Sequence, residues 1–144
     1  MLPYLHVIIG AVLALLVSFM LNVGFVYSLI IFLSFVLIDF DHYLIYLFRK
    51  KNFSLKKAYN YFLSLRNKKG KMKLFHPLCL FHTIEFLFII FILSFFSKIV
   101  FFIFVGFLSH SIFDIIDLAI RKKLYVREFS LIRYIKNRKK PNYI

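Results

Sequence analysis

The segment Gly106-Phe-Leu-Ser-His-Ser-Ile-Phe-Asp-Ile-Ile-Asp117 lies in a long apolar run and carries polar side chains at helical spacing. His110, Asp114 and Asp117 follow at i, i+4 and i+7, which places them on one stripe of a helix. A charge near the middle of a membrane costs about 2.5–3.5 kcal/mol on insertion scales, so these groups need partners. Imidazole nitrogens and carboxylate oxygens are ligands for Zn²⁺, Mn²⁺ and Fe²⁺. The stripe therefore predicts a polar pocket to which other helices contribute.

The composition around this stripe is far more apolar than that of a soluble domain. Hydrophobic residues make up 62% of the 144 residues, and 21 residues are Phe. The first apolar run has no charged leader and no small-residue cleavage site, so it predicts a membrane helix rather than a signal peptide. We expect an all-α membrane protein with a bundle of four transmembrane helices, over residues 4–21, 25–48, 78–96 and 99–120. This membrane domain spans residues 1–123, and a basic interfacial tail follows over 124–144.

Basic residues are confined almost entirely to two segments. Ten of the 20 Lys and Arg lie between Arg49 and Lys73, nine lie between Arg121 and Lys140, and the other is Lys98. By the positive-inside rule both segments, and hence both termini, face the cytoplasm of an inner membrane. This topology accounts for the net charge of +14, and no nucleic-acid motif is present, so we expect no nucleic-acid partner.

Within the basic loop over residues 49–73, apolar residues recur at helical spacing. This pattern predicts a short amphipathic helix on the membrane surface, with an apolar stripe of Leu55, Ala58, Tyr59, Phe62 and Leu65.

The remaining polar residues fall at one end of the expected bundle. Successive crossings alternate in direction, so both ends adjoining each basic segment lie on the same side of the membrane. All five His and five of the six acidic residues lie there, and Glu128 in the tail is the exception. The candidate metal ligands in this shared pocket are His6, Asp39, Asp41, His42, His76, His82, Glu85, His110, Asp114 and Asp117.

Charge balance indicates how many metal ions the pocket could hold. Five clustered carboxylates would repel one another, and two divalent cations would offset four of the charges. We therefore expect two ions, most readily Zn²⁺ with Mn²⁺ or Fe²⁺ as alternatives, and three ions are a further option. A carboxylate that is not a ligand could act as general base, and Asp41 and Glu85 are the candidates. The single Cys79 excludes an intramolecular disulfide, and we interpret it as an inert buried thiol.

Several of these motifs resemble a known family. His6-x3-Gly10, Asp39-x-Asp41-His42, His82-Thr83 and Gly106-x2-Ser109-His110-x3-Asp114 are similar to motifs of small polytopic inner-membrane proteins described as metal-dependent hydrolases. That family is distantly similar to zinc-dependent phospholipase C and P1-type nucleases, which hydrolyse phosphoesters. The resemblance implies that the ligands are His6, Asp39 or Asp41, His76, His82, His110 and Asp114.

These observations favour a metal-dependent hydrolase in which metal-activated water attacks a phosphoester or similar lipid-borne group at the cytoplasmic face. The partners would be membrane lipids, and the basic loops would attract an anionic or phosphorylated lipid-like substrate. One alternative is a transporter for divalent cations or protons, because intramembrane acids often mark such a path. Another is a structural protein whose buried polar cluster fixes helix packing. No nucleotide-binding fingerprint or Ser/Cys nucleophile arrangement is apparent.

Overall fold

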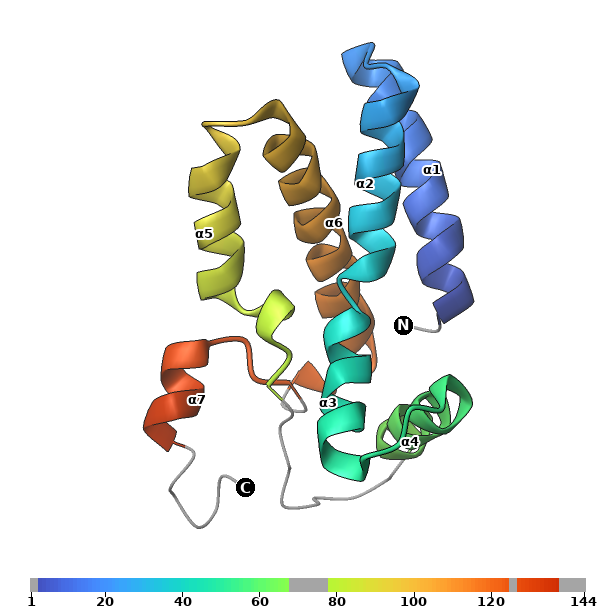
Figure 1. Ribbon diagram of the computed structural model, residues 1–144, viewed down its shortest axis with the longest axis vertical. Helices are drawn as coiled ribbons and strands as arrows, with labels where there is room; N and C mark the ends of the chain where they lie inside the picture. Colours follow the sequence, from blue (N-terminus) through green and yellow to red (C-terminus); the bar gives the residue numbers. More distant parts are fainter. Residues whose placement is uncertain (1–2, 68–77, 125–126, 138–144) are drawn as a thin grey trace.

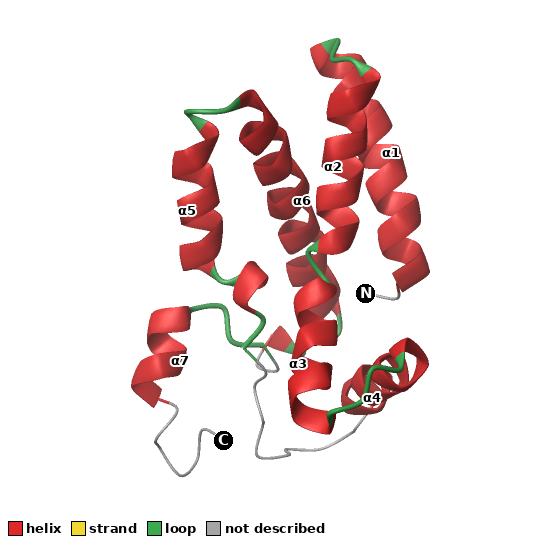
Figure 2. Ribbon diagram, viewed as in Figure 1, coloured by secondary structure: helices red, strands yellow, loops and turns green. Residues whose placement is uncertain are grey.

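The computed structural model describes residues 3–67, 78–124 and 127–137, and this part of the chain is helical (Figures 1 and 2). Three stretches are long and apolar enough to cross a membrane. They are α1 (Pro3–Leu21), the consecutive helices α2 (Phe25–Leu37) and α3 (Phe40–Lys50), and α6 (Lys98–Ile120). The helical class and three of the four expected apolar segments are therefore as predicted.

Helices α1, α2 and α6 pack around a small apolar core of Ala14, Ile31 and Phe102. Helix α6 approaches α2 closely at Gly106. A Cβ atom added there would lie 2.8 Å from the main-chain oxygen of Ile31 and 2.7 Å from Cβ of Ser34. Only glycine allows the two backbones to approach this closely, and the crossing aligns the later turns of α6 with the end of α2.

The helix expected over residues 25–48 is interrupted. Helix α2 ends at Leu37 and α3 begins at Phe40, with Asp39 at φ −70° and ψ −3° between them. The main-chain N–H of His42 donates to the carbonyl oxygen of Asp39 at 3.0 Å, which is a tighter turn than an α-helix makes. Short Asp side chains favour such local departures from the helix. The interruption places Asp39 between two helices.

The third expected membrane helix, over residues 78–96, is not a single span. It consists of a 3₁₀ turn, η1 (Leu80–His82), and the 11-residue helix α5 (Ile84–Ser94). Thr83 has an extended backbone, and its hydroxyl accepts from the N–H of Phe86, so it caps α5 and separates it from η1. At 1.5 Å per residue α5 is roughly 16 Å long, about half the thickness of a hydrocarbon core.

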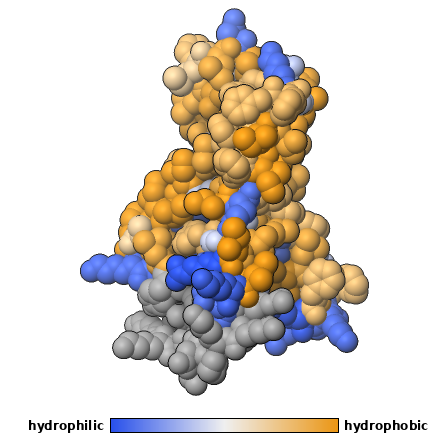
Figure 3. Space-filling model, turned by 90° about the vertical axis from the view of Figure 1, so that its left-hand side faces the viewer, coloured by the Kyte–Doolittle hydropathy of each residue, from blue (hydrophilic) through white to orange (hydrophobic). Residues whose placement is uncertain are grey.

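Two further helices lie at the end of the bundle where α3 ends (Figure 1). Helix α4 (Leu55–Asn67) forms where the amphipathic helix is expected, and its Ala58 is buried. Helix α7 (Leu131–Asn137) belongs to the basic tail. On the face shown in Figure 3, hydrophobic side chains cover most of the bundle, and hydrophilic side chains gather mainly at this same end.

Candidate metal centre

A buried cluster of histidine and aspartate side chains lies where the ends of α2 and α6 meet the start of α3. Four separate parts of the chain contribute His and Asp side chains to it: the start of α1, the interruption before α3 with the first turn of α3, the turn η1 and the second half of α6. Seven of the ten candidate ligands lie together here: His6, Asp39, Asp41, His42, His82, His110 and Asp114.

The first group of ligand atoms comes from Asp39, His82, His110 and Asp114, and these atoms all lie within 4.8 Å of one another. Oδ1 of Asp39 is 3.5 Å from Nε2 of His82 and 3.5 Å from Nε2 of His110. Oδ2 of Asp114 is 3.6 Å from Nε2 of His110 and 4.0 Å from Nε2 of His82. Ligands at Zn²⁺ distances of about 2.0–2.1 Å in tetrahedral geometry lie about 3.3–3.4 Å apart. The group therefore needs only small shifts to surround one ion.

The two imidazoles in this group have orphaned ring nitrogens. Nε2 of His82 and Nε2 of His110 are buried, and neither makes a hydrogen bond of good geometry within the described part of the chain. Buried polar atoms are normally satisfied, because leaving one unpaired costs about 1–3 kcal/mol. A cation shared with the carboxylates of Asp39 and Asp114 would satisfy both nitrogens at once.

The opposite nitrogen of each ring is held in place. Nδ1 of His110 donates to the main-chain oxygen of Phe35 at 2.7 Å, and Nδ1 of His82 donates to Oδ2 of Asp41 at 3.1 Å. Asp41 also accepts from the N–H of Phe81. A proton fixed on Nδ1 leaves Nε2 of a neutral imidazole able to bind a metal, as in carboxylate–histidine–zinc arrangements.

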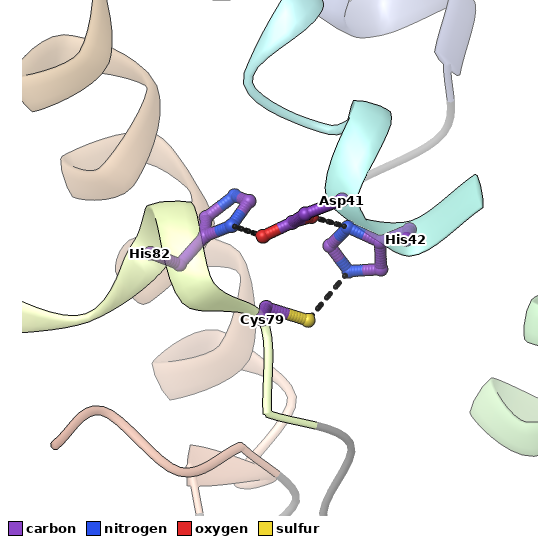
Figure 4. A group of neighbouring side chains, drawn as sticks. All are labelled: Asp41, His42, Cys79 and His82. Carbon is purple, nitrogen blue, oxygen red and sulfur yellow. Dashed lines mark hydrogen bonds and ion pairs between the residues drawn. The ribbon is translucent and has the colours of Figure 1, made fainter. Parts of the chain in front are cut away.

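A second group consists of Asp41, His42, Cys79 and His82 (Figure 4). Nδ1 of His42 lies 2.8 Å from Oδ1 of Asp41, and its Nε2 lies 3.5 Å from Sγ of Cys79. Thiolate, imidazole and carboxylate are all zinc ligands, so this group could also hold an ion. Cys79 is thus part of the cluster, although the sequence analysis interprets it as inert. The spacing Cys79-x2-His82 is the signal that could have indicated this role.

His6 approaches the first group from α1. Its Nε2 lies 3.3 Å from Oδ2 of Asp39 and 3.9 Å from Oδ1 of Asp114. Its ring stacks on that of His110, with centroids 4.6 Å apart. A His near a helix start could equally have been interfacial, but here it is buried among the ligands.

Glu85 lies outside the cluster. Its carboxylate accepts hydrogen bonds from the hydroxyl of Ser130 at 2.6 Å and from the main-chain N–H groups of Leu131 and Ile132. Burial raises the pKa of Glu85, but these hydrogen bonds outweigh it and lower the pKa to about 2. Glu85 therefore caps the N-terminus of α7 and fastens the tail to α5.

Two other candidate ligands are also not part of the described cluster. Asp117 points to Arg121, with 2.9 Å between Oδ1 and Nε, in an i, i+4 pair on α6. It lies almost one helical turn beyond Asp114, which places its carboxylate past the cluster. His76 lies outside the described residues.

Arg127 is a further member of the cluster, and it is not among the residues predicted from the sequence. Its Nη1 lies 2.8 Å from Oδ2 of Asp114, and its Nη2 lies 3.4 Å from Nε2 of His42. Burial lowers the pKa of Arg127, but the carboxylate of Asp114 outweighs it and holds the pKa above its ordinary value. Among the nine basic residues between Arg121 and Lys140, nothing in the sequence distinguishes this one.

The charges in the cluster differ from those expected. Three carboxylates are present, from Asp39, Asp41 and Asp114, and the guanidinium of Arg127 offsets one of them. With neutral imidazoles and a protonated Cys79 the balance is two negative charges, which one divalent cation would neutralise. Ionisation of the Cys79 thiol would add a negative charge to the second group and favour a second cation there.

Comparisons with protein-family models, with curated proteins and with solved structures found no match to this chain. The site must therefore be interpreted from its own chemistry.

Proposed function

We propose that this protein is a membrane-embedded, metal-dependent hydrolase that cleaves a phosphoester or similar group on a lipid-borne substrate. The observation that carries the proposal is the first ligand group, in which two carboxylates and two correctly oriented imidazoles face one another at ion-sharing distances. The resemblance to inner-membrane metal-dependent hydrolases supports the same chemistry, and so does the placement of the cluster at the end of apolar helices.

Asp39, His82, His110 and Asp114 would hold the ion, with His6 as a further ligand. The donor set of imidazole nitrogens and carboxylate oxygens fits Zn²⁺ best, and Mn²⁺ and Fe²⁺ are alternatives. Such an ion supplies Lewis acidity, which polarises a phosphoryl oxygen and acidifies water. We infer one ion in the first group, because the two groups share His82 and the charges balance with one cation.

The other residues of the cluster would orient and neutralise these ligands. Asp41 fixes the tautomer of His82 and contacts His42, which suits a positioning role more than that of general base. Glu85, the other candidate base, is engaged by α7. The side chain of Asp39 is 32% exposed, whereas those of His110 and Asp114 are almost fully buried, so water would reach the ligand group beside Asp39.

The pocket would open on the cytoplasmic side of the membrane. Helices α3 and α6, which carry part of the cluster, end at the segments rich in Lys and Arg that the positive-inside rule places in the cytoplasm. A pocket at this depth lies near lipid headgroups, where a lipid-borne phosphoester would be found. On the other side of the cluster Ala14, Ile31 and Phe102 pack tightly, which favours a closed pocket over the continuous path that a transporter needs.

The first test is the metal content of detergent-purified protein, measured by inductively coupled plasma mass spectrometry. We expect about one equivalent per chain in the wild type and its loss in His110→Ala and Asp114→Ala. Asp117→Asn is the matched control on the same helix and should retain the metal. Hydrolysis of phosphate monoesters and diesters should then depend on the same residues. Wild-type protein without metal above background would refute the proposal.

A further inference from the structure

A groove adjoins the cluster between α5, α6 and the tail, and its volume is about 140 Å³. Its walls are formed by the apolar side chains of Ile84, Leu87, Ile115 and Phe129. An apolar cavity of about 150 Å³ accommodates a benzene-sized group, so this groove can hold a short apolar segment. Ile84 is 67% exposed and Ile115 is 42% exposed, which means that the groove adjoins the surface facing the lipid.

Polar groups complete the lining of the groove. His82 and Arg127 belong to the cluster and also line the groove, so the two spaces are contiguous. Ser111 contributes a hydroxyl that is buried and makes no hydrogen bond within the described residues. A guanidinium carries five N–H donors, more than its contacts to Asp114 and His42 require, and it binds phosphate strongly through paired hydrogen bonds.

The groove thus combines an apolar surface with a cationic, hydrogen-bonding part. We propose that it binds a membrane lipid with a phosphate headgroup, whose apolar portion lies against Ile84, Leu87, Ile115 and Phe129 and whose phosphate contacts Arg127 and Ser111. The N–H groups of Arg127 beyond those that contact Asp114 and His42 would bind an anionic headgroup, and the contiguity with His82 brings that headgroup to the ligand cluster. This inference rests on the hydrolase function proposed above and specifies its substrate class.

The tail determines the shape of this site. The main-chain N–H of Ile84 donates to the carbonyl oxygen of Phe129 at 2.9 Å, and Glu85 holds the next residues of the tail. These contacts place Phe129 in the wall of the groove and Arg127 beside Asp114.

Lipid binding can be measured by Trp fluorescence quenching instead of by turnover. The chain contains no Trp, so a single introduced Trp is the only Trp signal. A single reporter, Ile115→Trp, would lie in the groove, and Ile116→Trp is the matched control on the next residue of the same helix. Each variant is placed in vesicles that contain brominated phosphatidic acid or brominated phosphatidylcholine. We expect phosphatidic acid to quench Ile115→Trp preferentially, beyond any preference at Ile116→Trp that general attraction to the basic segments produces.

Arg127→Gln in the Ile115→Trp background should abolish the headgroup preference, with lipid binding weakened about tenfold or more. Arg127→Lys retains the charge and should preserve part of the preference, and thermal unfolding identifies variants that fail to fold. Equal preference at both reporter positions, or a preference unchanged in folded Arg127→Gln, would overturn the lipid site. Bound metal without a headgroup preference would reject this inference and leave the metal site standing. A headgroup preference in protein that binds no metal would support the lipid site and reject the metal-dependent hydrolase.

Discussion

Nδ1 of His110 donates a hydrogen bond to the main-chain carbonyl oxygen of Phe35, 2.7 Å away. Because a carbonyl can only accept, the proton of the neutral ring must reside on Nδ1. Nε2 is then unprotonated, and it faces Asp39 and Asp114 at 3.5 and 3.6 Å. The packing of α6 against α2 therefore determines which nitrogen of this imidazole is available to a metal.

Gly106→Ala should disturb this packing. Its new Cβ would lie 2.8 Å from the main-chain oxygen of Ile31, so α6 must move away from α2 and carry His110 with it. We expect a loss of stability of about 1–3 kcal/mol, measured by thermal unfolding in detergent, together with weaker metal binding. Gly24→Ala is the control, because nothing lies within 4 Å of its added Cβ. Similar effects of the two substitutions would contradict the close crossing.

Asp41→Asn should weaken metal binding without abolishing it. The substitution removes the carboxylate that holds Nδ1 of His82, and loss of such an orienting partner typically lowers metal affinity about 10–100-fold. Competition with a chelator of known affinity measures the change. Asp117→Asn should leave the affinity unchanged, and complete metal loss in Asp41→Asn would instead make Asp41 a direct ligand.

Cys79→Ser distinguishes one bound ion from two. If only the first ligand group holds a metal, the variant retains the wild-type stoichiometry, because Cys79 belongs to the second group. Metal content per chain, measured beside that of His110→Ala, is the readout. A loss of half the metal in Cys79→Ser would show that both groups are occupied.

Glu85→Gln should release the tail. The neutral amide accepts more weakly from Ser130, Leu131 and Ile132, so the amide hydrogens at the start of α7 should exchange several-fold faster. The pKa of Glu85 is lowered from 4.5 to about 2. The stabilisation that the ionised carboxylate gives to the start of α7 is therefore complete above about pH 4.5 and is lost as the pH falls toward 2. Hydrogen exchange of wild type and variant at pH 6 and pH 3 measures both effects.

Amide exchange at the start of α7 would also show if this prediction for Glu85→Gln is wrong. If exchange at Leu131 and Ile132 is the same in wild type and variant at pH 6, Glu85 does not cap α7. Exchange in the middle of α1, which lies on the opposite side of the bundle from α7, should be unaffected in either protein and serves as the internal reference.

The sequence predicts that these distant polar residues lie together, because their clustering depends only on the order of the helices. The alternating directions of successive helices place His6, Asp39 and His110 toward one end, whatever the details of packing. Which of these polar residues belong to the ligand cluster depends on their positions along each helix. Asp117 shares a stripe with His110 in projection, but it lies almost two turns further along the axis than His110 and pairs with Arg121.

The local backbone geometry around α5 and the path of the tail cannot be predicted from the order of the helices. Hydropathy does not distinguish an 11-residue helix capped by Thr83 from a full membrane span, because Leu78 to Phe96 is apolar almost throughout. Arg127 reaches the cluster only because Glu85 and Ile84 hold the tail against α5. That contact joins residues more than 40 positions apart, and helical periodicity carries no information about it.

The guanidinium beside Asp114 also gives the pocket an order of assembly during synthesis. Asp39 and Asp41 leave the ribosome early, Asp114 follows much later, and Arg127 emerges last of the charged groups that meet here. Until then Asp114 lacks this cationic partner, and burying its carboxylate would carry a larger desolvation cost. We therefore expect the ion pair that neutralises Asp114 to be the last charged contact of the pocket to form.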